Sequence, residues 1–275
     1  MSLSCHPMEH RMSKIIPTSF SDIPYDLYKE IRNSIDSGLI KECIMILSDI
    51  YQKTSENGQN KHININITGN IGAGKSTTCE VISKLIGEEL IKNNVRFVKY
   101  PEYIRAYMYG EEMLRLRAEK IISVETFQHY ILDYWELVLD YYKYASKKAI
   151  NIFERLPEDS IYCFAKIAHE EHEISDEGWN RLIHRYNDVQ DRFHCIEAKD
   201  TKTFIVSNEG SISKTVEAIL KIIRDFYKDN HNDLNLTILL KVSQDTLKER
   251  IEVRNRDSEK KLENDYLNSL NDYYA

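Results

Sequence analysis

The chain has 275 residues, of which 42% are hydrophobic and 29% are charged, as in an ordinary soluble globular protein. Its net charge of −7 argues against a general nucleic-acid binder, because such proteins carry a basic face that neutralises phosphates. No stretch approaches the roughly 18 consecutive apolar residues of a membrane span. We therefore expect neither a nucleic acid nor a membrane as a partner.

Residues 1–61 are expected to form a partly helical N-terminal extension, which precedes the main domain at 62–275. Apolar residues recur at helical spacing from Leu27 onwards. The N-terminus lacks the apolar segment of a secretory signal, and the five cysteines are scattered without C-x-x-C spacing. Both observations favour a cytoplasmic protein with reduced thiols.

The main domain alternates predicted strands with predicted helices. Ile63, Ile65 and Ile67 alternate with polar residues, which predicts a first strand that ends at Gly69. Strands that alternate with helices predict an α/β fold with a five-stranded parallel sheet covered on both faces. The expected strands are 63–69, 95–100, 149–153, 203–206 and 236–242, and the expected helices cover about 76–92, 103–147, 160–170, 176–192, 213–227 and 244–274.

A glycine-rich segment between the first strand and the first helix fits the P-loop pattern G-x-x-x-x-G-K-[ST]. Glycines let backbone N–H groups turn towards phosphate oxygens, and the helix N-terminus adds its dipole. A lysine then reaches the β- and γ-phosphates, and the following hydroxyl can ligate Mg²⁺. The segment predicts an ATP site formed by Gly69, Asn70, Ile71, Gly72, Ala73, Gly74, Lys75, Ser76 and Thr77.

Further motifs follow the P-loop in a fixed order. They are Tyr100-Pro101-Glu102 at the end of the second strand, Phe127-Gln128 in a helical region, Glu154-Arg155 after the third strand, and Arg250, Arg254 and Arg256 after the last strand. Over residues 62–170 and 234–270 this order resembles the deoxyribonucleoside kinase family, which includes thymidine, deoxycytidine and deoxyguanosine kinases and the herpesvirus thymidine kinases. The resemblance implies the P-loop NTPase fold with an arginine-rich lid.

The resemblance also implies roles for the charged residues. Glu102 matches the family's general base for the sugar 5′-hydroxyl, and Lys75 and Arg155 complete the implied catalytic set. Glu154 and Ser76 are implied to support Mg²⁺. The three lid arginines clamp the phosphates and the adenine in the family.

The substrate contacts implied by the resemblance are more varied. Gln128 matches the glutamine that pairs with the base, and Tyr107 falls where the family has a tryptophan that lines the base pocket. Glu259 matches the lid acid that binds the sugar 3′-hydroxyl, while Arg155 also contacts the 5′-hydroxyl end. Trp135 and Ser160 replace an Arg–Asp pair of deoxycytidine- and purine-type members. A bulky tryptophan there narrows the pocket, so we expect pyrimidines, with thymidine above deoxycytidine.

The chain departs from the family pattern in two places. The family's sugar-binding tyrosine lies about a dozen residues before the glutamine, where this chain has 115–118 without a tyrosine. The family also has a strand and a helix after the lid, whereas this chain carries such a unit before the lid strand, at 203–227. We hypothesise that this unit fills the missing position in the main sheet.

These observations predict an ATP- and Mg²⁺-dependent kinase of a small-molecule deoxynucleoside, acting in nucleotide salvage for DNA synthesis. Family members are usually dimers formed through helices, and the aromatic stretch 130–144 suits either a core or a subunit interface, so a homodimer is expected. Two alternatives stay open: a nucleoside monophosphate kinase, and a non-catalytic nucleotide-binding protein. The motif order with Glu102 argues against the first, because a phosphate acceptor needs no carboxylate base, whereas the missing tyrosine and the altered order of the C-terminal elements keep the second open.

Overall fold

The computed structural model describes residues 23–56, 62–144, 148–193, 202–229, 234–256 and 264–274. Within these residues, five strands form one sheet in the spatial order β2-β3-β1-β5-β4, and each neighbouring pair is parallel. The predicted α/β architecture is therefore confirmed. The strands are β1 (Ile63–Gly69), β2 (Phe97–Tyr100), β3 (Ile150–Glu154), β4 (Lys202–Ser207) and β5 (Asn235–Lys241).

The central strand β1 is buried along its whole length, although its sequence alternates isoleucine with polar residues. The side chain of Asn64 is paired with asparagines of both neighbouring strands. Asn151 Nδ2 donates to Asn64 Oδ1 at 2.9 Å, and Asn64 Nδ2 donates to Asn235 Oδ1 at 2.8 Å. These asparagines are register partners on β3, β1 and β5. The hydrogen bonds offset the cost of burying the amides.

Strand β4 lies at one edge of the sheet, beside β5. It is followed by α11, so the strand–helix unit that precedes the lid strand belongs to the main sheet, as hypothesised from the sequence. In consequence the chain reaches the edge strand first and then returns to the inner position at β5.

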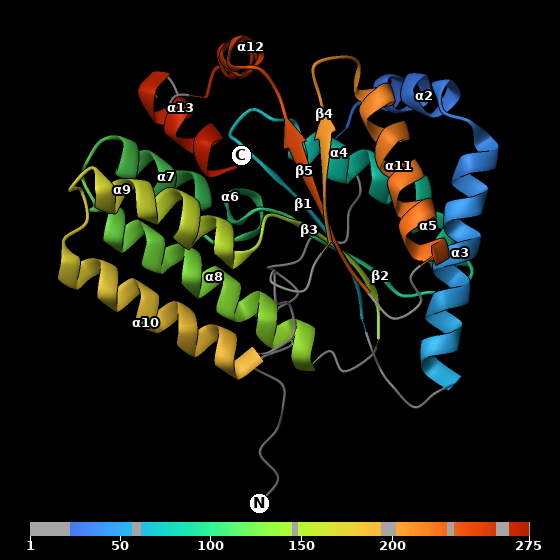
Figure 1. The fold of residues 1–275 in the computed structure, drawn as a ribbon, viewed down its shortest axis with the longest axis horizontal. Helices are drawn as coiled ribbons and strands as arrows, with labels where there is room; N and C mark the ends of the chain where they lie inside the picture. The colour runs from blue at the N-terminus through green and yellow to red at the C-terminus, as the bar shows by residue number, and fades with distance from the viewer. Residues whose placement is uncertain are drawn as a thin grey trace, which may run out of the picture.

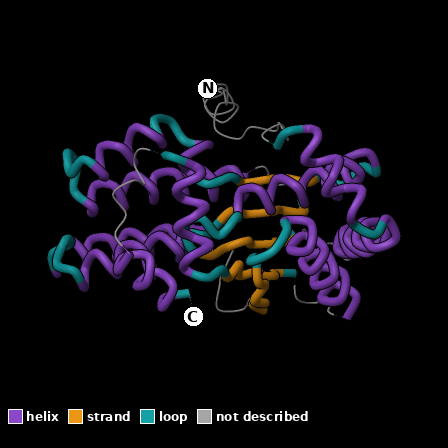
Figure 2. Tube along the Cα trace, turned by 90° about the horizontal axis from the view of Figure 1, so that it is seen from above, coloured by secondary structure: helices purple, strands orange, loops and turns teal. Residues whose placement is uncertain are grey.

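Helices cover both faces of the sheet (Figures 1 and 2). On one face, α3 and α11 pack with α4 and the central strands in a single hydrophobic core that includes Leu47, Ile67 and Leu220. Cys43 Sγ also donates to Leu220 O at 3.2 Å. The elements of this layer are α2 (Tyr25–Ser34), α3 (Ser37–Glu56), α4 (Lys75–Ile82), a π-helical segment (Ser83–Gly87), α5 (Glu88–Lys92) and α11 (Ile212–Asp229).

The opposite face carries the aromatic helix α8, whose Tyr134, Trp135 and Tyr142 are buried in a second core. The expectation that this stretch forms core is confirmed for these side chains. Helix α8 shares this layer with several shorter helices and with α10. The elements are α6 (Tyr103–Ala106), α7 (Gly110–Ala118), α8 (Val124–Tyr144), a π-helical segment (Asp159–Ala165), α9 (Lys166–Glu170) and α10 (Asp176–Phe193).

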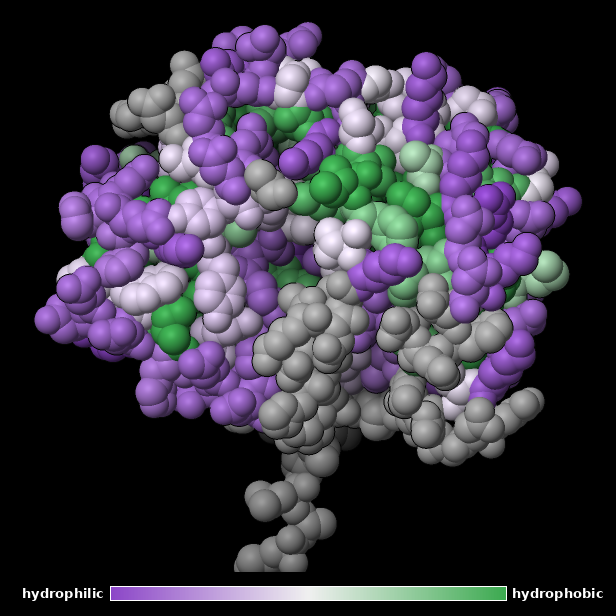
Figure 3. All heavy atoms as spheres, viewed as in Figure 1, coloured by the Kyte–Doolittle hydropathy of each residue, from purple (hydrophilic) through white to green (hydrophobic). Residues whose placement is uncertain are grey.

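Two further helices, α12 (Gln244–Arg254) and α13 (Asn264–Tyr273), lie beyond the carboxyl ends of β4 and β5 (Figure 1). Figure 3 shows that hydrophilic residues cover much of this face of the molecule, with hydrophobic residues exposed near its centre and to the right. Among the described helices, none combines the length and the apolar character needed to cross a membrane.

Candidate active site

The P-loop joins β1 to α4 at the carboxyl edge of the sheet, where parallel α/β proteins bind their ligands. Gly69 has φ +138°, and a Cβ there would lie 2.5 Å from the carbonyl oxygen of Leu240. Gly74 has φ +86°, and a Cβ there would lie 2.5 Å from Nδ2 of Asn208. Both positions need glycine for their backbone conformation and for the closeness of their neighbours.

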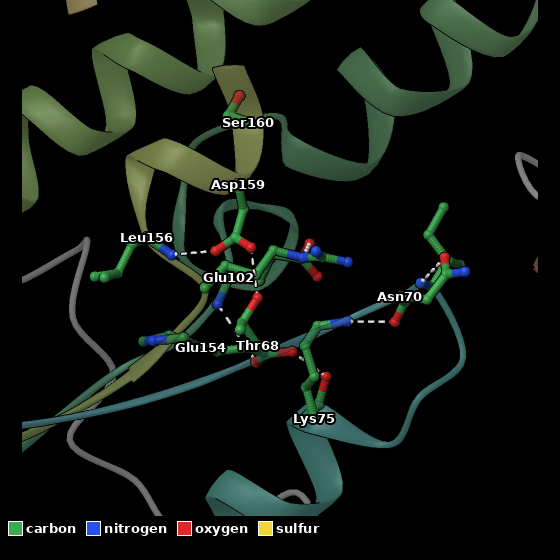
Figure 4. A network of polar contacts seen from close by, with 12 residues as sticks. Thr68, Asn70, Lys75, Glu102, Glu154, Leu156, Asp159 and Ser160 are labelled. Atoms are coloured by element: carbon green, nitrogen blue, oxygen red, sulfur yellow. Dashed lines mark hydrogen bonds and ion pairs between the residues drawn. The ribbon is translucent and has the colours of Figure 1, made fainter. Parts of the chain in front are cut away.

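Lys75 begins α4 and points back over the loop, where its Nζ donates to Asn70 O at 2.8 Å (Figure 4). The side chain is buried, and burial together with nearby Arg155 lowers its pKa to about 8. A cation so poorly solvated gains strongly from a phosphate partner. The residue therefore occupies the place expected for the phosphate-binding lysine.

Two carboxylates meet beside this lysine. Glu154 ends β3 and accepts from Ser76 Oγ at 2.5 Å, and its other oxygen lies 3.5 Å from the backbone N–H of Glu102. Burial and the Glu102 carboxylate raise the pKa of Glu154. Burial also raises the pKa of Glu102, but Arg155 and Lys75 outweigh it and hold that pKa below its ordinary value of 4.5. The two acids therefore differ in character.

Arg155 is the cation that holds Glu102. Its Nε donates to Glu102 Oε1 at 3.0 Å, and its guanidinium lies 4.8 Å from the centroid of the Phe164 ring. The residue has φ +69°, an uncommon conformation that turns its side chain away from the course of β3. Its backbone N–H donates to Ile67 O at 3.0 Å, which fixes this turn against β1. Motif residues far apart in sequence are thus brought into direct contact.

A cavity of about 820 Å³ extends from the P-loop to the aromatic helix α8. At its far end, Ser160 Oγ donates to Gln128 Oε1 at 2.5 Å, and both side chains are buried. The wall around this pair is largely apolar and includes Phe127, Ile131 and Trp135. The cavity therefore contains a charged end, at the P-loop, and an amide-bearing end that is mainly aromatic.

Helix α12 places arginines beside the P-loop. Arg250 Nη2 donates to Asn208 O at 2.6 Å, whereas its Nη1 is buried without a hydrogen-bond partner among the described residues. Such an orphaned donor suits an anionic ligand. Arg254 and Arg256 also line the cavity. Glu259 lies outside the described residues.

Tyr107 does not line the cavity in the described residues. Helix α6 is a single turn, and Tyr107 follows it in an extended conformation, with its ring against Tyr130 at 4.8 Å between centroids. The neighbouring Tyr103 and Ile104 line the cavity instead. The Tyr107 side chain, which was expected to line the base pocket, packs against Tyr130 and Tyr134 instead.

Three contributions were missed in the sequence. Asn208 follows β4 and donates through Nδ2 to Ala73 O at 2.7 Å, so it supports the P-loop; its place after a parallel strand was the available signal. Arg117 lines the cavity and pairs with Glu173 at 2.5 Å, which only the fold reveals. Tyr274, next to the C-terminus, reaches Arg155, and no local pattern indicates it.

Comparison with known proteins gives a consistent assignment. A family model described as deoxynucleoside kinase matches residues 65–205 and 195–275. A solved deoxyadenosine kinase from M. mycoides with bound dATP is 24% identical, with a TM-score of 0.49, over 78% of this chain and 82% of that chain. A second one, with products dCMP and a flexible dCDP bound, is 22% identical, with a TM-score of 0.49, over 77% and 81%. No curated protein matches the chain.

Proposed function

This chain belongs to the deoxynucleoside kinase family, and from that premise we propose that it transfers the γ-phosphoryl group of ATP to the 5′-hydroxyl of a deoxyribonucleoside. One observation carries the proposal: the carboxylate of Glu102 lies in the same cavity as Lys75 of the P-loop and the amide of Gln128. The cavity therefore offers, in one ligand-sized space, an amide for the nucleobase, a carboxylate for the sugar hydroxyl and a lysine for the phosphates.

In this proposal Glu102 is the general base. Its lowered pKa keeps the carboxylate ionised at neutral pH, so it can accept the proton of the 5′-hydroxyl. The sugar oxygen then forms a bond to the γ-phosphorus, and the bond to the β-phosphate oxygen breaks. Lys75 and Arg155 offset the negative charge that spreads over the transferring group.

ATP is proposed to bind along the P-loop, with its phosphates against the backbone N–H groups and Lys75. The unpartnered Nη1 of Arg250 supports this orientation, and Arg254 and Arg256 line the same space. One guanidinium group can donate two parallel hydrogen bonds to phosphate oxygens. The three arginines can therefore lie along the phosphate chain when the lid is closed. Glu259, from the same segment, is proposed as the partner of the sugar 3′-hydroxyl.

Mg²⁺ is proposed to bind at Ser76 and Glu154. Their oxygens lie 2.5 Å apart beside the P-loop, and Mg²⁺ prefers such oxygen ligands in phosphate sites. When bound, the ion supplies positive charge to the phosphate oxygens. Burial and the Glu102 carboxylate raise the pKa of Glu154, and a cation bound to this carboxylate would offset both effects.

We propose that the sugar is contacted by Arg117 in place of the tyrosine that the chain lacks. Arg117 stands 11 residues before Gln128, and its side chain lines the cavity while pairing with Glu173. An arginine already paired with a carboxylate can still donate from its remaining N–H groups to a sugar hydroxyl.

A pyrimidine base, and thymine above cytosine, is proposed at the far end. The indole of Trp135 lines the cavity and is held against Tyr134, with ring centroids 5.3 Å apart, so the wall does not easily yield to a purine. The amide of Gln128 offers a donor and an acceptor, which match O4 and N3–H of thymine.

We also propose that the protein is a cytoplasmic homodimer, assembled through helices of the aromatic layer. Tyr130 and Tyr141 of α8 remain partly exposed, in keeping with a further contact. Light scattering on the purified protein should give about twice the mass of one chain. A single-chain mass at micromolar concentration would refute the dimer.

One phosphorylation panel tests the proposed function: thymidine, deoxycytidine, deoxyadenosine, deoxyguanosine and thymidine monophosphate, each with ATP and Mg²⁺. We expect the highest kcat/KM for thymidine, then deoxycytidine, and no transfer to the monophosphate. A purine preference would overturn the base assignment only. Transfer to thymidine monophosphate alone, or nucleotide binding without transfer to any nucleoside, would contradict the proposed reaction.

A further inference from the structure

Helix α13 ends against the carboxyl edge of the sheet, beside Arg155. Tyr274 follows the helix and is buried, with its ring packed in a small core that contains Cys163, Leu239 and Leu270. A phenol this deeply buried needs partners for its hydroxyl, because an unsatisfied polar group costs free energy in an apolar surrounding. Its partners are Arg155 and Asp159, which follow β3 at the carboxyl edge of the sheet.

The hydroxyl of Tyr274 lies between a cation and an anion. Arg155 Nη1 donates to it at 2.5 Å, and the hydroxyl donates in turn to Asp159 Oδ1 at 2.9 Å. A phenol has one proton and two lone pairs, so it can accept from the guanidinium and donate to the carboxylate at once. All three side chains are buried.

Asp159 is itself fixed by the strand that leads to the P-loop. Its Oδ1 also accepts from Thr68 Oγ1 at 2.5 Å, and its Oδ2 accepts from the backbone N–H of Leu156 at 2.7 Å (Figure 4). Thr68 immediately precedes Gly69. The phenol therefore connects Arg155 to a rigid anchor that belongs to both β1 and the segment after β3.

Helix α13 has a second contact with the P-loop. Asn70 Nδ2 donates to Leu267 O at 3.1 Å and to Asn271 Oδ1 at 2.7 Å. The same helix thus touches the phosphate-binding loop and, through Tyr274, the arginine that holds the catalytic carboxylate. This double contact is unlike that of a helix that only covers a hydrophobic surface.

We propose that Tyr274 is a positioning residue for phosphoryl transfer, whose hydroxyl fixes the Arg155 guanidinium so that its Nε stays on the Glu102 carboxylate. The inference rests on the proposed role of Glu102 as the general base. Tyr274 itself touches neither substrate nor the transferring phosphate in this account. Its effect is transmitted through Arg155, which is held by Glu102 on one side and by the phenol on the other.

The test compares Tyr274→Phe with Tyr273→Phe. The neighbouring Tyr273 is a matched control, because its hydroxyl donates to Glu170 outside the cavity. With thymidine and ATP, we expect Tyr274→Phe to lower kcat about tenfold while KM for ATP changes little, as for a lost hydrogen bond to a charged group. Tyr273→Phe should keep the wild-type kcat.

A pH profile separates positioning from a structural role. The charged groups around Glu102 are Arg155, Lys75 and Arg256, with Glu154 as the neighbouring acid. If the phenol is lost, Arg155 is held less firmly and its lowering effect on the pKa of Glu102 weakens. The acid limb of kcat/KM for thymidine should then move to higher pH in Tyr274→Phe and stay in place in Tyr273→Phe.

Wild-type kcat together with a wild-type acid limb in Tyr274→Phe would overturn the proposal. A lower melting temperature with unchanged kcat and pH profile would also overturn it, since the hydroxyl would then act on stability alone. Glu102→Gln, measured in parallel, tests the premise separately. Near-normal turnover of that variant would refute the assignment of Glu102 as the general base, whatever the result for Tyr274→Phe.

Discussion

The two ends of the cavity are built on different principles. At the phosphoryl end, Lys75 and Arg155 are buried and Glu102 is partly buried, and each of these charged side chains is held by a partner from another segment. At the base end, the polar groups are the amide of Gln128 and the hydroxyl of Ser160, joined by one hydrogen bond inside an apolar wall. Charge governs one end, and shape governs the other.

This difference indicates where the protein can change without losing its reaction. Buried charges cannot be removed singly, because the partner that remains is left uncompensated. A neutral amide and a hydroxyl can be exchanged at much smaller cost. We therefore expect mutations at the phosphoryl end to reduce kcat for every nucleoside, and mutations at the base end to change which nucleoside is preferred.

The largest effect is expected for Glu102→Gln, which keeps the shape of the side chain but removes the carboxylate that we propose as the general base. Its kcat should fall by about 10² or more for every nucleoside, as for the loss of a general base, while ATP binding persists. Steady-state kinetics and ATP titration measure the two quantities. As a control, Glu112→Gln changes a glutamate on the exposed face of α7, paired with Arg115, and should leave kcat unchanged.

Gln128→Leu should act at the other end, lowering kcat/KM for thymidine about 10- to 100-fold with little change in KM for ATP. The buried base would lose its paired hydrogen bonds in a site built to supply them. Gln52→Leu, on the exposed side of α3, is the matched control. If KM for ATP rose by the same factor, the two ends of the cavity would not act separately.

The pH dependence of ATP use tests the charged end without a mutation. Burial and the neighbouring Arg155 lower the pKa of Lys75 to about 8, so the free enzyme loses this cation as pH rises through that value. We expect kcat/KM for ATP to fall above about pH 8, by up to tenfold per pH unit. Bound phosphates favour the cation, so the limb in kcat should lie at higher pH. If kcat/KM for ATP and kcat fell at the same pH, the proposed contact between Lys75 and the phosphates of ATP would be contradicted.

The smallest effect is expected for Ser160→Ala. The variant removes the hydroxyl that donates to Gln128 Oε1, which costs about the value of one neutral hydrogen bond and lowers kcat/KM for thymidine about 2- to 10-fold. The ratio of thymidine to deoxycytidine should change, while kcat stays near that of the wild type. A loss as large as that of Glu102→Gln would mean that the base end is not governed by shape.

The sheet could be predicted from the sequence because its strands are local patterns. The alternation in β1 and the glycine that ends it predict both the strand and the loop. The burial of both faces of β1 could not be read there, since Asn64 is satisfied by Asn151 and Asn235 from other strands. The π-helical segments were likewise invisible, because helical spacing does not distinguish them from α-helix.

The charged half of the site was predictable because motif order brings Glu102, Glu154 and Arg155 to strand ends at one edge of the sheet. Tyr107 does not line the cavity in the described residues, because a motif position does not fix the direction of a side chain after a one-turn helix. Tyr274 could not be found at all. Its contact with Arg155 spans 119 positions and depends on the docking of α13.

We propose above that the carboxylate end of the cavity acts on the sugar 5′-hydroxyl. The most direct measurement offers thymidine and 5′-deoxythymidine, which lacks that hydroxyl, to the enzyme with ATP and Mg²⁺, and locates the phosphate on the product by ³¹P NMR. We expect thymidine 5′-phosphate from the first and no phosphorylated product from the second. A 3′-phosphate, or phosphorylation of 5′-deoxythymidine, would contradict it.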